Sequence, residues 1–177
     1  MPQHLSPRAQ HLPRGSWAWL VILAVCSGTL ACAPSESGPP PVAELSQKVE
    51  YKNVTLTVNT AEKTDALGAD QQRLEQVSRP ITAGEGKTFL VVNVTIENKT
   101  PYRLQYQAGQ FALQDSSGAA YSPGVATGAR PLGRGELEPT KDASGIINFI
   151  VPRDARDFVL KYRIPNQQES LSVRLGV

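Results

Sequence analysis

The sequence predicts an all-β domain in which two antiparallel sheets pack face to face. First, residues 88–98, TFLVVNVTIEN, place apolar side chains at alternate positions, which is the period of a β-strand. Second, the other apolar segments beyond residue 48 are short, rich in β-branched residues and bounded by turn residues. Third, no long helical pattern interrupts them. About seven short strands separated by turns are typical of a β-sandwich.

Residues 88–98 are expected to form the central strand, because Leu90, Val92, Val94 and Ile96 would share one buried face. The other strands should pair around it. In chain order they are expected at residues 54–58, 102–106, 111–113, 119–121, 147–151, 158–162 and 171–175.

Turn chemistry separates these strands. Residues 115–118, DSSG, are typical of the turn of a β-hairpin. Two connections, residues 62–87 and 122–136, are polar, contain several glycines and are longer than strand pairing requires. Loops of this kind carry binding residues more often than core strands do.

The first 31 residues have the three parts of an export signal. Arg8 and Arg14 precede a continuous apolar run, residues 17–25, and small residues then lead to Cys32. The run is shorter than the roughly 20 apolar residues that span a bilayer. We therefore expect a signal that is cleaved, rather than a permanent membrane helix.

Residues 28–32, GTLAC, resemble the lipobox of bacterial lipoproteins, in which a small residue precedes a cysteine that is acylated and becomes the mature N-terminus. Ala31 meets the small-residue requirement, whereas Thr29 stands where leucine is usual. The resemblance implies that Cys32 carries lipid and anchors an exported protein on the extracytoplasmic side of the cell membrane. The other interpretation is a secretory signal cleaved near Ala31, with Cys32 incidental.

Three regions follow from these patterns. Residues 1–31 are expected to be a lipoprotein signal peptide. Residues 32–48 contain the cysteine and a segment rich in Pro, Ser and Gly, which is typical of a flexible, disordered tether. Residues 49–177 have the length of one domain with one core.

The composition excludes several classes of function. Both histidines, His4 and His11, and one of the two cysteines, Cys26, lie in the leader. A mature chain without histidine excludes a histidine general base, a Ser-His-Asp triad and an ordinary zinc site. Two of the 18 basic residues also lie in the leader, which leaves 16 against 16 acidic residues. This balance of charge argues against nucleic-acid binding. From the composition as a whole we expect no cofactor, no metal and no catalytic residue.

Three blocks of the sequence carry a family resemblance: residues 87–100, KTFLVVNVTIENKT; residues 111–123, FALQDSSGAAYSP; and residues 137–162, LEPTKDASGIINFIVPRDARDFVLKY. They resemble successive blocks of a bacterial family of exported and lipid-anchored proteins known only as a domain of unknown function. The fold of that family is similar to the immunoglobulin-like sandwich of a mycobacterial immunoprotective antigen. Thr140 stands where the family commonly has glycine. The resemblance implies an immunoglobulin-like sandwich and an extracytoplasmic location, and it supplies no catalytic residues.

Two groups of residues are candidates for binding. Arg130 and Arg134, in a glycine-rich loop with Lys141 nearby, have the chemistry to hold an anionic ligand; the alternative is that they only solvate the loop. Three tyrosines could form an exposed aromatic strip that binds carbohydrate or peptide. The alternation of Tyr102 and Tyr106 with Leu104 instead favours packing of these two in the core. The three are Tyr102, Tyr106 and Tyr121.

The sequence therefore favours a non-catalytic, lipid-anchored binding or accessory protein of the bacterial cell envelope. Its expected partners are the membrane, through the anchor, and an envelope protein or surface component. One alternative is a structural or antigen-like surface protein without a small ligand. The other is a hydrolase that uses carboxylates, for which the sequence offers no motif.

Replacing Cys32 by serine tests the anchor. Because acylation requires the thiol, we expect Cys32→Ser to release the protein from membranes or to block its maturation. Fractionation of cells with and without detergent measures this. Unchanged, detergent-dependent membrane association of the variant would contradict lipidation at Cys32.

Overall fold

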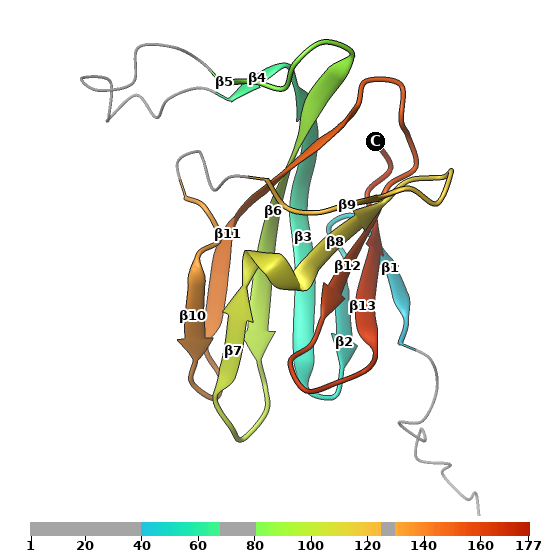
Figure 1. Cartoon of the computed structure of the whole chain (residues 1–177). Coiled ribbons are helices and arrows are strands. Elements are labelled where there is room, and N and C mark those ends of the chain that lie inside the picture. Colours follow the sequence, from blue (N-terminus) through green and yellow to red (C-terminus); the bar gives the residue numbers. More distant parts are fainter. Residues whose placement is uncertain (1–39, 68–80, 125–129) are drawn as a thin grey trace, which may run out of the picture. The chain divides into compact units, whose positions relative to one another are not determined.

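The computed structural model describes residues 40–67, 81–124 and 130–177 (Figure 1). A 3₁₀ helix, η2 (Ala108–Gln110), follows the seventh strand. In chain order the strands are β1 (Val42–Glu44), β2 (Lys48–Tyr51), β3 (Val54–Thr64), β4 (Ala66–Leu67), β5 (Ile81–Thr82), β6 (Lys87–Asn98), β7 (Leu104–Gln107), β8 (Phe111–Gln114), β9 (Ala120–Tyr121), β10 (Arg134–Leu137), β11 (Asp142–Pro152), β12 (Val159–Arg163) and β13 (Ser170–Arg174).

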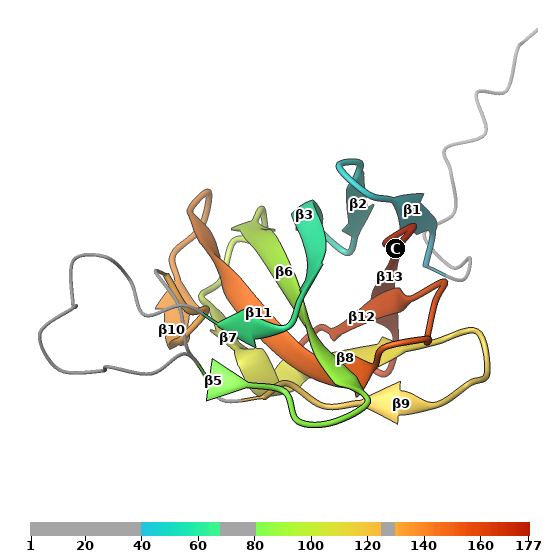
Figure 2. The same ribbon diagram turned by 90° about the horizontal axis from the view of Figure 1, so that it is seen from above.

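The strands form two larger sheets that pack against each other (Figure 2). One has the order β11-β6-β3-β2, and the other has the order β1-β13-β12-β8-β9. Two-stranded ribbons, β10-β7 and β4-β5, complete the described residues. A single cluster of buried apolar side chains draws on both larger sheets. The predicted all-β sandwich is therefore confirmed.

Strand β6 has the central position that the sequence predicts. It pairs antiparallel with β11 on one side and with β3 on the other, along nearly its whole length. Leu90, Val92, Val94 and Ile96 are all fully buried. Each of them faces the opposing sheet because alternate side chains of a strand point to the same side.

The N-terminal boundary of the folded part differs from the prediction. Strand β1 lies inside the segment predicted as a tether, and it pairs in parallel with β13 near the end of the chain. Ala43 is buried in the core, and Glu44 forms a 3.1 Å ion pair with Arg174. The prediction of a flexible tether is thus wrong for residues 42–48. The predicted signal peptide, Cys32 and the tether up to residue 39 lie outside the described residues.

The predicted hairpin at residues 115–118 is confirmed as the β8–β9 pair. One carboxylate oxygen of Asp115 accepts hydrogen bonds from the backbone N–H groups of Ser117 and Ala119, at 2.9 and 3.0 Å. The other accepts the hydroxyl of Tyr121 at 2.6 Å. Hydrogen bonds from Ser117 and Tyr121 hold the pKa of Asp115 below its usual value, and the same carboxylate raises the pKa of Tyr121 to about 12. Tyr121, in β9, therefore helps to hold the turn through its hydroxyl group.

The first long connection predicted, residues 62–87, is shorter than expected. Strand β3 continues to Thr64, with an irregularity in its pairing to β6 between Val58 and Thr60. The β4–β5 ribbon follows, and residues 68–80 lie outside the described part of the chain. Among the described residues no helix is long and apolar enough to cross a membrane.

Replacing Val94 by alanine tests the burial of β6. Val94 is fully buried between its register partners Val58 and Gly145. We expect Val94→Ala to lower the free energy of unfolding by about 2–3 kcal/mol, because the lost methyl groups leave a cavity. Val91→Ala, on the half-buried opposite face of β6, is the matched control and should cost clearly less. Denaturant unfolding measures both free energies. Equal losses of unfolding free energy in the two variants would contradict the assignment of Val94 to the buried face of β6.

Candidate functional site

The β7–β10 ribbon has an apolar face and a polar face. Its two strands are antiparallel, and Leu104 and Leu137 are register partners that are both buried in the core. Two further cross-strand pairs alternate with the buried positions and so lie on the opposite face. These pairs are Gln105 with Glu136, and Gln107 with Arg134.

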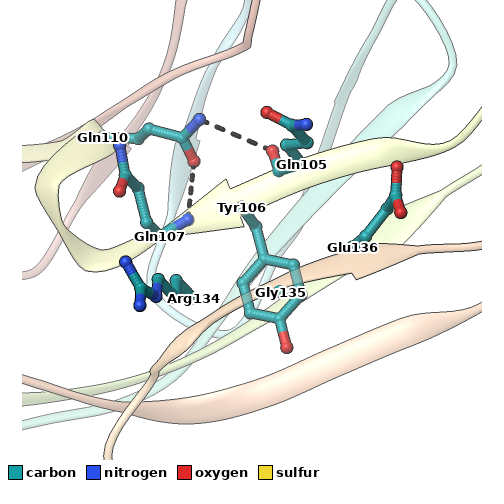
Figure 3. Close-up of a pocket in the computed structure, with 7 residues that line it drawn as sticks. All are labelled: Gln105, Tyr106, Gln107, Gln110, Arg134, Gly135 and Glu136. Atoms are coloured by element: carbon teal, nitrogen blue, oxygen red, sulfur yellow. Dashed lines mark hydrogen bonds between the residues drawn. The ribbon is translucent and has the colours of Figure 1, made fainter.

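Tyr106 of β7 and Gly135 of β10 are register partners, and the tyrosine ring lies close to the glycine backbone. A Cβ atom at Gly135 would lie 2.6 Å from the hydroxyl oxygen of Tyr106 and 2.8 Å from its Cζ. Figure 3 shows the Tyr106 side chain extending from β7 across β10 at this position. Only glycine admits the ring so near the backbone.

A shallow pocket of about 370 Å³ lies at this ribbon. It is lined by residues of β7, η2 and β10, which are Gln105, Tyr106, Gln107, Gln110, Arg134, Gly135 and Glu136 (Figure 3). The side chain of Gln110 joins η2 to β7, because its Oε1 accepts the backbone N–H of Gln107 at 2.9 Å. Its Nε2 donates to the carbonyl oxygen of Gln105 at 3.5 Å. Gln110 therefore shapes one wall of the pocket.

The other polar side chains are less constrained. Within the described residues, the side-chain amide of Gln105 and the guanidinium of Arg134 make no hydrogen bond or ion pair. Glu136 lies 3.5 Å from Arg103, whose guanidinium is closer to Glu138, at 2.6 Å. Gln105 and Arg134 thus offer hydrogen-bonding groups that the fold does not use.

One of the three cations that the sequence grouped together lines the pocket. Arg134 lines the pocket, but Arg130 and Lys141 are not among the lining residues. The carbonyl oxygen of Arg130 accepts the backbone N–H of Ile146 at 2.8 Å, which ties this part of the loop to β11. Residues 125–129 of the same loop lie outside the described residues. A binding role for Arg130 and Arg134 remains a prediction.

The three tyrosines have different environments, and the expected core packing is wrong for Tyr102. That side chain is 76% exposed, because β7 begins only at Leu104. The carbonyl oxygen of Tyr102 accepts the side-chain amide of Asn98 at 2.7 Å, so the residue belongs to the turn before β7. Tyr106 is half-buried against the core, and Tyr121 bonds to the β8–β9 turn.

Four pocket residues, Gln105, Gln107, Gln110 and Glu136, are not among the binding residues that the sequence predicts. The register of β7 with β10 brings the side chains of the two strands together, and no local sequence pattern encodes that register. The described residues contain no group of three or more His, Cys, Asp or Glu side chains placed to hold a metal ion.

A family model described as a domain of unknown function, DUF4352, matches residues 43–170. The chain belongs to this family. The resemblance carried by the three sequence blocks is thereby confirmed. No curated protein matches the chain.

Several solved structures resemble the chain. The yjhA protein of Bacillus subtilis is 17% identical, with a TM-score of 0.54, and the match covers 75% of this chain and 98% of that one. A putative lipoprotein of B. subtilis, ycdA, is 14% identical, with a TM-score of 0.58, over 73% of this chain and 38% of its own. The secreted Mycobacterium tuberculosis protein MPT63 is 16% identical, with a TM-score of 0.48, over 80% and 100%. At these identities the yjhA and ycdA matches show a shared fold.

Replacing Gly135 by alanine tests the contact with Tyr106. The added Cβ would overlap the tyrosine ring, so we expect Gly135→Ala to displace the ring and to lower the free energy of unfolding by about 1–3 kcal/mol. Gly133→Ala is the control, because nothing lies within 4 Å of a Cβ there. Denaturant unfolding of both variants measures the difference. A Gly135→Ala protein as stable as Gly133→Ala would refute the close approach.

Proposed function

We propose that the protein is an exported, lipid-anchored binding protein of the bacterial cell envelope that recognises its partner through the pocket on the β7–β10 ribbon. One observation carries this proposal. The ribbon is held to the core by Leu104 and Leu137, yet its other face presents Gln105 and Arg134 without partners among the described residues. The side-chain groups of Gln105 and Arg134 are thus able to form hydrogen bonds with a partner.

Export and anchoring rest on the sequence. The leader, residues 1–31, ends in the lipobox-like GTLAC, and Cys32 is the residue to be acylated. One of the similar structures bears a name that agrees with this location, since ycdA is called a putative lipoprotein. The domain would then face the extracytoplasmic side.

The pocket supports binding rather than hydrolysis. A glycosidase of the common type needs two carboxyl groups that flank the scissile bond. In this pocket Glu136 is the one carboxylate among the lining residues, and Arg103 lies 3.5 Å from it. Glu138 is held at 2.6 Å by the same guanidinium and does not line the pocket. This arrangement favours a non-catalytic protein.

A structural or antigen-like surface protein without a small ligand is the second candidate. The shallowness of the pocket favours it, because Gln105, Gln107 and Arg134 are exposed and bury little of any ligand. The two candidates differ in one consequence. Only a binding protein should lose an interaction when a single exposed side chain of the pocket is removed.

Replacing Arg134 by alanine makes that distinction. We expect Arg134→Ala to reduce the yield of crosslinked species in intact cells, because the guanidinium lines the pocket. Its melting temperature should stay within about 2 °C of wild type, as for other exposed positions. Arg130→Ala is the matched comparison, because Arg130 is an exposed arginine of the loop before β10 and does not line the pocket.

The outcomes separate three cases. Loss of crosslinking with Arg134→Ala alone supports recognition at the pocket. Equal loss with Arg130→Ala would extend recognition along the loop, as the sequence suggests. Normal crosslinking with both variants would favour the structural role.

A further inference from the structure

The charge of the pocket restricts its ligand. Arg134 and Glu136 are the charged lining residues, and their formal charges cancel. The neighbouring Arg103 lies between Glu136 and Glu138, so the surroundings add no strong positive field. An anion attracted by Arg134 would meet the carboxylate of Glu136 on the same ribbon, and a cation attracted by Glu136 would meet the guanidinium of Arg134. The arrangement favours an uncharged ligand.

The hydrogen-bonding groups restrict the ligand further. Arg134 only donates, the Glu136 carboxylate only accepts, and the amide of Gln105 does both. These three side chains lie on one face of two adjacent strands, so donors and acceptors alternate over a short distance. A ligand that matches them needs groups that donate and accept on neighbouring atoms. The hydroxyl groups of a sugar have this property.

The size and lining of the pocket agree with this class. Its volume of about 370 Å³ is near the lower end of the range for small-molecule sites. The glutamines that line the pocket supply methylene groups, against which the C–H face of a sugar ring can pack. The open shape lets a longer chain continue on either side.

We infer that the ribbon pocket binds a neutral saccharide segment of one or two rings, held by Gln105, Arg134 and Glu136. This inference rests on the proposed binding function and names its ligand class. A peptide partner is the competing macromolecule, and main-chain pairing along a strand edge is its usual mode. The side chains of Gln105, Arg134 and Glu136 point from the face of the ribbon and not along a strand edge, which favours the sugar over a peptide.

The test uses the full chain in detergent micelles and saturation-transfer NMR with two neutral probes, chitotriose and maltotriose. We expect at least one probe to receive saturation from the wild-type protein. Gln105→Ala combined with Arg134→Ala should raise the dissociation constant about tenfold or more, because two sets of hydrogen bonds are lost. Gln168→Ala with Arg163→Ala removes the same residue types at exposed positions outside the pocket and should change nothing.

Three results would overturn the inference. The first is no saturation transfer from the wild-type protein to either probe. The second is a dissociation constant of the Gln105→Ala, Arg134→Ala variant equal to that of wild type. The third is displacement of the bound sugar by millimolar inorganic phosphate, which would indicate an anion site. If no sugar binds but Arg134→Ala still reduces crosslinking in cells, the saccharide inference fails and the proposed function stands. If a sugar binds at the pocket but crosslinking is unchanged, the proposed envelope partner fails and the ligand class stands.

Discussion

The pairing of β6 on both sides is the interaction on which the rest of the sandwich depends. Backbone hydrogen bonds to β3 and β11 fix its register, and that register turns Leu90, Val92, Val94 and Ile96 together into the core. The folded part, residues 40–177, contains no cysteine and so no internal disulfide. Burial of apolar surface is therefore the main stabilising term.

The core is apolar enough to tolerate one costly feature. The hydroxyl of Tyr162 is fully buried and has no hydrogen-bond partner within the described residues, and burial raises its pKa. Leaving such a group unpaired costs about 1–3 kcal/mol. Its ring stacks on Phe111, with centroids 4.7 Å apart, and such a contact contributes about 0.5–1.5 kcal/mol. The two effects are similar in size, so packing of the ring offsets much of the cost.

Two glycines determine where the segment before and through β10 runs. At Gly145 a Cβ would lie 2.6 Å from the Cα of Leu132, so the loop backbone passes directly over β11. The N–H of Leu132 donates to the carbonyl oxygen of Ile146 at 2.8 Å and fixes this crossing. Gly135 then admits the Tyr106 ring three residues later. Arg134 lies between these two anchored points, so the position of its backbone beside the pocket is fixed.

The sequence predicts those features that a local pattern encodes. The period of two identifies β6 and the buried face of β13, and the DSSG turn identifies the β8–β9 hairpin. Strand β1 escapes prediction because its partner lies near the other end of the chain, and short edge strands carry little pattern of their own. The pocket escapes for a similar reason. Alternation around Leu104 turns Gln105 away from the core, but residue 136 falls in a predicted loop that the structure ends with β10, and only the register of β7 with β10 shows that Gln105 and Glu136 lie side by side.

Two of the outward polar faces among the described residues differ in a way that bears on function. On the central sheet, the side-chain amide of Asn59 donates to Asn93 at 3.1 Å and to Thr95 at 3.0 Å, and the hydroxyls of Thr95 and Ser144 are 2.8 Å apart. These groups satisfy one another across three strands, so a ligand there would have to replace bonds that already exist. On the β7–β10 ribbon, Gln105 has no such partner within the described residues. A ligand adds hydrogen bonds at the ribbon without breaking any made by that amide, and this difference favours the ribbon as the recognition surface.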